Sequence, residues 1–263
     1  MSRPPRPLIP DACYHVTARG NRKANIYLDD RDYLVWHDLV ARTADRFGFV
    51  CHAYCQMPNH FHMLLETPMP NLSEGMHFLN CTYSQHFNVR HGLTGHVFQG
   101  RFHSVLLEEE SHFLELLRYI ALNPVRAGLV ASAEDWRWSS YRATAGLVAA
   151  PEWLDTSTVR KRFHGTSDAE RIQAFRDFVS AGIGLHSPLK PLPCLSWIAK
   201  RTGSKRLRKP CAQGCTALLT SQSISKFQRR RYKEYAQPKL RVKEEKMSTF
   251  VPDPGVDIFR GQA

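Results

Sequence analysis

The stretch MPNHFHMLLE, which runs from Met57 to Glu66, places two histidines one residue apart directly after Pro58 and Asn59. Because proline cannot donate to a strand ladder, we expect a short turn here and a new antiparallel strand beginning at His60. Residues i and i+2 of a strand project from the same face, so His60 and His62 point the same way. Two neutral imidazoles on one face form half of a metal site. Two histidines satisfied inside a sheet explain the same spacing equally well.

The flanking sequence alternates expected strands with expected helices. Strands are predicted over residues 14–19, 49–54, 60–66 and 96–107, and helices over 33–48, 72–89 and 111–123. The strand patterns alternate in hydrophobicity, and the helices carry apolar stripes such as Leu34, Trp36, Leu39, Val40 and Ala44. Helices separated by antiparallel strands favour an α+β fold, a small antiparallel sheet with helices packed on it.

Three regions are predicted along the chain. Residues 1–147 contain the domain with the histidines, and residues 148–185 form a short helical extension that includes a helix near 169–179. Residues 186–263 are rich in Pro, Ser, Lys and Arg, which predicts a basic, poorly ordered C-terminal tail.

The positive charge of the chain is concentrated in that tail. Residues 1–185 contain 19 basic and 19 acidic residues, so the formal net charge of +12 comes entirely from residues 186–263. A basic segment of this kind is typical of binding to a polyanion such as nucleic acid. A solubilising tail is the alternative.

The composition predicts a cytoplasmic protein. No apolar run approaches the roughly 18 residues needed to cross a bilayer, and no apolar segment follows the basic start MSRPPRPLIP. Seven scattered cysteines suit reduced thiols better than a disulfide framework. The spacing of Cys194, Cys211 and Cys215 is too irregular to favour zinc.

A second stretch, RYIALNPVRAGLV, covers residues 118–130. Tyr119 and Asn123 are four residues apart, which places them on one face of a helix. The Asn123 amide oxygen would suit a third metal ligand, with Tyr119 one turn away. Taken singly, Tyr119 is better explained as a core tyrosine and Asn123 as a cap residue before Pro124. Proline also biases the residue before it away from helical backbone, which leaves the i+4 geometry open.

Together these features resemble the HUH-type single-tyrosine transposases, in the branch of the REP-associated tyrosine transposases and their insertion-sequence relatives. The matching features occur in the family's order over residues 8–145 and do not extend to the tail. They are His60-Phe61-His62 after Pro58-Asn59, Tyr119-x3-Asn123-Pro124, Tyr14-His15-Val16, Arg19-Gly20-Asn21, Asp29-Asp30, the segment 102–107, and Trp138-Ser139-Ser140-Tyr141. The resemblance implies a ferredoxin-like or RRM-like HUH fold.

The resemblance also implies a mechanism. A divalent metal, Mg²⁺ or Mn²⁺, held by His60, His62 and Asn123, would polarise the scissile phosphate for attack by Tyr119. The products would be a 5′-phosphotyrosine link and a free 3′-hydroxyl, so strand ends can be rejoined and DNA transposed. Two imidazoles and an amide suit Mn²⁺ better by ligand preference.

The substrate implied by the resemblance is single-stranded DNA, in many members a hairpin. Arg19, Arg22, Lys23, Arg101 and Arg126 are candidate phosphate contacts, although each is equally explained as an ordinary surface charge. The family leaves monomer and homodimer open, and with them whether Tyr119 serves its own chain's metal site. The expected location is the cytoplasm, on the bacterial nucleoid when DNA is bound.

Three other functions remain open on the sequence. A non-catalytic DNA-binding or regulatory protein would use the same fold. A replication or mobilisation nickase would use the same chemistry, but no second tyrosine motif or helicase domain is recognisable. A metal-dependent hydrolytic nuclease would use an activated water and form no covalent adduct.

Overall fold

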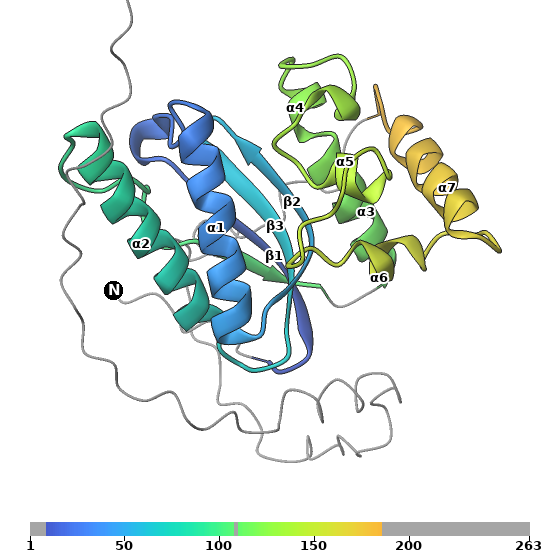
Figure 1. Cartoon of the computed structure of the whole chain (residues 1–263), viewed down its shortest axis with the longest axis horizontal. Helices are drawn as coiled ribbons and strands as arrows, with labels where there is room; N and C mark the ends of the chain where they lie inside the picture. Colours follow the sequence, from blue (N-terminus) through green and yellow to red (C-terminus); the bar gives the residue numbers. More distant parts are fainter. Residues whose placement is uncertain (1–8, 108–109, 186–263) are drawn as a thin grey trace, which may run out of the picture. The chain divides into compact units, whose positions relative to one another are not determined.

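The computed structural model describes residues 9–107 and 110–185, and its centre is a four-stranded antiparallel sheet (Figure 1). The strands are β1 (Ala12–Arg19), β2 (Val50–Met57), β3 (His60–Thr67) and β4 (His103–Leu106), in the spatial order β2-β3-β1-β4. Pro58 and Asn59 form the two-residue turn between β2 and β3. The predicted turn and the strand that starts at His60 are therefore confirmed.

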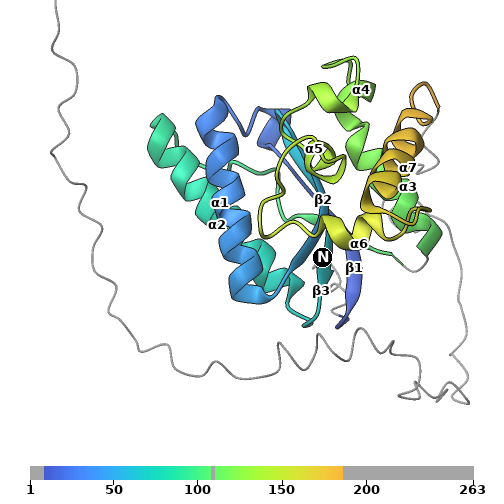
Figure 2. The ribbon, with the colours of Figure 1, turned by 45° about the vertical axis from the view of Figure 1, so that its right-hand side comes forward.

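Two long helices cover one face of the sheet, as both views show (Figures 1 and 2). They are α1 (Asp30–Phe47) and α2 (Leu72–His91). The Asp29 carboxylate caps α1 by accepting a hydrogen bond from the Asp32 N–H at 3.2 Å, and Gly48 ends it with a left-handed φ of 72°. The apolar stripe of each helix packs on the sheet, around the buried side chains of Trp36, Phe61, Met63, Met76 and Tyr83.

A third helix, α3 (Glu110–Ala121), packs on the opposite face, against β2 and β3. It is followed by the short helices α4 (Asn123–Arg126), α5 (Tyr141–Thr144) and α6 (Thr156–Arg160), and by α7 (Asp168–Ser180), which lies against α3 (Figure 2). Single 3₁₀ turns occur at Asn21–Lys23 and Ala133–Asp135. This layer has its own core, which includes Leu64, Leu117, Ile120, Phe175 and Val179.

The order βαββαβ with this strand arrangement confirms the predicted α+β, ferredoxin-like sheet. The fourth strand is shorter than the predicted 96–107. Between residues 96 and 102 only Phe98 pairs with β1's end, through an isolated bridge to Gly20, and the ladder with β1 begins at His103. The division at residue 147 stays a prediction, and the poorly ordered tail predicted for 186–263 lies outside the described residues.

The aromatic segment after α4 packs back on the sheet edge. The Trp138 carbonyl accepts a hydrogen bond from the Gln56 N–H at 2.9 Å, and the Trp138 ring stacks on Tyr33 with centroids 4.3 Å apart. Trp138 is therefore buried in the core. No helix of the described part of the chain is long and apolar enough to cross a membrane.

A buried carboxylate ties α2 to the start of α1. Asp32 is almost fully buried and accepts hydrogen bonds from the Leu28 N–H, from His91 at 3.0 Å and from Arg90 at 2.5 Å. Arg90 also contacts the Asp29 carboxylate at 2.5 Å. The guanidinium of Arg90 lowers the pKa of Asp29 to about 2. We therefore expect Arg90 to contribute to the stability of the fold, although part of its side chain is exposed.

We expect Arg90→Ala to lower the free energy of unfolding by roughly 2–4 kcal/mol, because it removes a charged partner from a buried carboxylate. Urea titrations of both proteins would measure the difference. Arg137→Ala is the matched control, since Arg137 pairs with Asp30 at an exposed site and should change stability by about 1 kcal/mol or less. The stabilisation that the Asp29–Arg90 ion pair contributes should be complete above the pKa of Asp29 in the unfolded chain, about 4, and should disappear as the pH falls toward 2. Equal effects of the two substitutions would contradict the argument.

Candidate active site

The site is built on β3. Phe61 points to the α1–α2 face, where its ring lies 5.1 Å from that of Trp36, so its neighbours His60 and His62 point to the α3 face. The two imidazole centroids are 5.0 Å apart with planes at 82°. His62 is buried and His60 is half-buried, so the pair lies at the margin of the core.

A third histidine joins them from β1. In the antiparallel register Thr17 lies opposite His62 and Arg19 opposite His60, which puts the odd-numbered residues of β1 on the same face. The His15 Nε2 atom lies 2.9 Å from His62 Nδ1, a hydrogen bond between the two rings. The His62 ring is therefore held by His15 through Nδ1.

Asn59 holds the other histidine in the same manner. Its side-chain amide nitrogen donates to the Lys23 carbonyl at 3.0 Å, so its oxygen is the atom that faces His60 Nδ1, at 2.6 Å. Since an amide oxygen can only accept, His60 Nδ1 carries the proton and donates. The lone pair of His60 is then on Nε2.

Burial keeps these rings neutral. It lowers the pKa of His15 and of His60 to about 4, with a further contribution from Arg19 at His60. The pKa of His62 is well below its usual value, first because of burial and then because of its neighbours His15, His60 and Arg19. Neutral imidazole is the form that binds a metal ion.

Tyr119 on α3 meets the histidines. Its ring lies edge-on to His62 with centroids 5.5 Å apart at 88°, and 6.1 Å from His15. The strand with the histidines and the helix with the tyrosine are thus brought together within one chain. Tyr119 is half-buried and also packs on the core of the α3 layer. It can therefore be both a core tyrosine and a residue of the site.

Asn123 is the half-buried first residue of α4. Pro124 has no N–H to donate and α3 ends at Ala121, yet the helical turn continues across the break. The Leu122 N–H donates to the Arg118 carbonyl at 3.0 Å and the Arg126 N–H donates to the Leu122 carbonyl at 2.9 Å. Asn123 therefore stays one helical turn beyond Tyr119.

The basic residues predicted to contact phosphate surround this group. The Arg126 guanidinium lies 5.5 Å from the Tyr119 ring centroid, and Arg19 is the cross-strand neighbour of His60. Arg22 and Lys23 are exposed in the 3₁₀ turn that Asn59 contacts, with φ values of 53° and 63°. Arg101 is exposed two residues after Gln99, whose N–H donates to the Arg19 carbonyl at 2.8 Å.

The family model described as "Transposase IS200 like" matches residues 9–123, the segment that contains the sheet, α1 to α3, and these site residues except Arg126. These residues are similar to the IS200-like transposases. The chain is thus similar over this segment to a family of DNA transposition enzymes, and that family implies a divalent metal ion.

Individual proteins are also similar to parts of this chain. A curated protein of Haemophilus influenzae, described as a REP-associated tyrosine transposase, is 25% identical over 145 residues, which are 48% of this chain and 82% of that protein. The solved structure of a REP-associated tyrosine transposase bound to a REP hairpin is 22% identical and covers 60% of this chain and 96% of its own, with a TM-score of 0.48. A transposase structure from Deinococcus radiodurans R1 is 17% identical and covers 45% of this chain and 95% of its own, with a TM-score of 0.33.

The sequence did not reveal the roles of His15 and Asn59. His15 lies in the motif Tyr14-His15-Val16 and Asn59 in the pair Pro58-Asn59. The contact of His15 depends on the register of β1 against β3, and that of Asn59 on the fold of the Asn21–Lys23 turn. The alternation of His15, Thr17 and Arg19 along β1 was the available signal for a shared face.

Proposed function

We propose that this protein is a transposase that nicks single-stranded, hairpin-bearing DNA through Tyr119 in a metal-dependent reaction and transfers the strand from a 5′-phosphotyrosine intermediate. The observation that carries the proposal is the packing of Tyr119 edge-on to His62, 5.5 Å between ring centroids, beside a pair of neutral histidines. A nucleophile and a pair of metal-binding imidazoles from one chain are what this chemistry requires.

The donor set fits a divalent ion. His60 and His62 both have Nδ1 engaged in a hydrogen bond, to Asn59 and to His15, which leaves Nε2 of each ring for coordination. Asn123, one turn beyond Tyr119, would add an amide oxygen. When bound, Mg²⁺ or Mn²⁺ would polarise a non-bridging phosphate oxygen and favour the phenolate form of the tyrosine.

The chain's own residues account for the remaining steps. The Tyr119 oxygen loses its proton and forms a bond to phosphorus, while the bond from phosphorus to the 3′-oxygen breaks and that oxygen takes up a proton. The phosphodiester becomes a phosphotyrosine ester of similar energy, so the 3′-hydroxyl of a second strand end can reverse the step. The Arg126 guanidinium lies over the Tyr119 ring, 5.5 Å from its centroid, where it could contact the phosphate that Tyr119 attacks.

His15 and Asn59 act as positioning residues in this proposal. Metal-binding histidines commonly donate their other ring N–H to a fixed acceptor, which sets the tautomer and the orientation of the ring. The hydrogen bonds at 2.9 Å and 2.6 Å have this form when His62 and His60 donate from Nδ1.

The DNA is proposed to run over the basic residues around the site. Arg19 and Arg126 lie nearest the tyrosine and histidines, and Arg22, Lys23 and Arg101 extend the positive surface along the adjoining loops. Contacts of this kind bind the phosphate backbone and orient the strand without reading its sequence. The hairpin form of the DNA, a homodimeric assembly and a place on the nucleoid remain proposals from the family resemblance.

An adduct assay with 3′-labelled hairpin DNA and Mn²⁺ tests the proposal, because a 5′-phosphotyrosine link retains the segment on the 3′ side of the cut. The full chain should give a labelled species that survives denaturation, and Tyr119→Phe, which keeps the ring packing, should give none. A wild-type chain that forms no adduct, or a Tyr119→Phe chain that still forms it, would overturn the proposal. Cleavage without adduct would indicate a hydrolytic nuclease, and binding without cleavage a regulatory protein.

The role of His15 predicts a selective effect on metal affinity. We expect His15→Leu to weaken Mn²⁺ binding about 10- to 100-fold, because His62 loses the acceptor that orients it. His15→Gln, whose amide oxygen can accept the same hydrogen bond, should recover much of that affinity. Electron paramagnetic resonance of free Mn²⁺ gives both dissociation constants. Equal losses in the two variants would show that His15 matters only for packing.

A further inference from the structure

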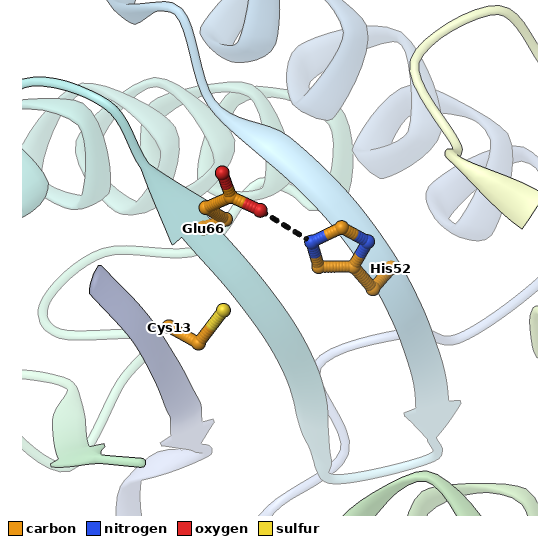
Figure 3. Close-up of side chains that lie close together, drawn as sticks. All are labelled: Cys13, His52 and Glu66. Atoms are coloured by element: carbon orange, nitrogen blue, oxygen red, sulfur yellow. Dashed lines mark hydrogen bonds and ion pairs between the residues drawn. The ribbon is translucent and has the colours of Figure 1, made fainter. Parts of the chain in front are cut away.

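A second group of metal-binding side chains lies on the same face of the sheet, away from the tyrosine. Cys13 on β1, His52 on β2 and Glu66 on β3 direct their sulfur, nitrogen and oxygen atoms into one space, all within 4.8 Å of one another (Figure 3). Glu66 is four residues along β3 from His62, about 13 Å at the rise of a strand. The group is therefore separate from the proposed catalytic pair.

The sheet itself creates this convergence. Cys13 and Glu66 are direct partners in the β1–β3 register, so their side chains leave the same face side by side. The β2–β3 register shifts between Cys51 and Ala53, and His52 is the extra residue of that bulge. A bulge can re-aim a side chain, and here the His52 ring faces α3, 5.4 Å from the Phe113 ring.

The surroundings of His52 resemble those of a metal ligand. Its ring is almost fully buried, and Nε2 lies 2.9 Å from the Glu66 carboxylate. Nδ1 has no hydrogen-bond partner among the described residues but lies 4.0 Å from the Asp155 carboxylate on its other side. Asp155 is fixed in turn as the cap of α6, where it accepts from the Thr158 N–H at 3.0 Å. A carboxylate behind the distal nitrogen is a common support for a metal-binding histidine.

We propose that Cys13, His52 and Glu66 bind a zinc ion. A thiolate, an imidazole and a carboxylate are the ligand types that zinc takes, at about 2.0–2.3 Å. Three such ligands lie roughly 3.3–3.8 Å from one another around one ion, so small side-chain movements suffice. The fourth position goes to water, since Asp155 lies on the opposite side of the His52 ring.

Binding redistributes two protons. The Cys13 thiol releases its proton as the sulfur–zinc bond forms, and His52 presents an unprotonated Nε2 while Nδ1–H turns toward Asp155. An ion pair of His52 with Glu66 accounts for the 2.9 Å contact, and a zinc ion would in addition engage the Cys13 sulfur that faces the same space. A bound zinc ion would join β1, β2 and β3 at one end of the sheet and stabilise the folded chain.

Cobalt substitution separates this site from every other metal site of the protein. The catalytic pair contains no cysteine, and a thiolate ligand gives Co²⁺ a charge-transfer absorption in the near ultraviolet. The test uses the full chain with Cys194, Cys211 and Cys215 replaced by serine, because these cysteines would give the same band. We expect one equivalent of Co²⁺ to produce the band and one equivalent of Zn²⁺ to remove it.

Matched variants make the result decisive. Cys13→Ser should abolish the band and the rise in melting temperature that Zn²⁺ gives, while adduct formation through Tyr119 continues. Cys81→Ser should change neither, although Cys81 lies 3.5 Å from His77 and is the obvious competing site. Glu66→Gln should keep the band but weaken Zn²⁺ binding at least tenfold. The inference is overturned if the parent shows no band, if Cys13→Ser retains it, or if Glu66→Gln leaves the affinity unchanged.

Discussion

Replacing His60 and His62 together by alanine is expected to lower the rate of adduct formation by about 10³-fold or more. The two rings are the only imidazoles of the described residues that combine an engaged Nδ1 with a position beside Tyr119, so the double variant removes most of the proposed donor set. A metal ion that polarises a phosphate contributes several kcal/mol to the transition state, and each 1.4 kcal/mol corresponds to a factor of ten. Single-turnover measurements with 3′-labelled DNA give the rates.

His77→Ala is the control for this experiment, because His77 lies on α2 at the other face of the sheet. It should form adduct at the wild-type rate. DNA affinity of the double variant, measured without metal, should stay within a few fold of wild type because the phosphate contacts come from arginine and lysine. A double variant that still forms adduct efficiently would refute the placement of the metal.

Trp36→Ala is expected to destabilise the fold by about 3–5 kcal/mol, the largest effect on stability of any single change discussed here. Trp36 is completely buried between α1 and the sheet, and its ring lies 5.1 Å from Phe61 and 6.0 Å from Tyr54. The cavity left by an indole in this position cannot be filled by two aromatic rings that are themselves fixed. Denaturant unfolding followed by circular dichroism would measure the loss.

Leu34→Ala provides the comparison on the same helix. Leu34 is 53% exposed, so its truncation should change the free energy of unfolding by about 0.5 kcal/mol or less. If both substitutions had similar effects, α1 would not pack on the sheet through the stripe that contains Trp36.

Leu34 shows the limit of predicting the buried side of a helix from its apolar residues alone. Trp36, Leu39 and Val40 lie on the predicted stripe and are buried, while Leu34, counted on the same stripe, faces solvent. Two residues along a helix turn the side chain by about 200°, so Leu34 and Trp36 cannot share a face. The apolar residues were enough to predict the helix. Predicting which of them are buried required the 3.6-residue period to be followed strictly.

In the candidate site, too, some residues could be predicted from the sequence and some contacts could not. His60, His62 and Tyr119 could be proposed from short motifs because alternation in a strand and spacing in a helix are local properties. The contact of His15 with His62 depends on the pairing of two strands 47 residues apart. The convergence of Cys13, His52 and Glu66 depends on that pairing and on a bulge, and a bulge of one residue leaves no clear mark in the composition of a strand.

The Asn59 amide has a consequence for how the protein responds to its substrates. It joins the Lys23 carbonyl to the His60 ring, and the neighbouring backbone adds the bonds from Gly20 N–H to the Asn59 carbonyl and from Ile26 N–H to the Pro58 carbonyl, each at 2.8 Å. Hydrogen bonds therefore join the loop with Arg22 and Lys23 to the turn that orients His60. If binding of DNA to this loop changes the affinity of the proposed site for a metal ion, linkage requires that the metal ion change the affinity for DNA by the same factor.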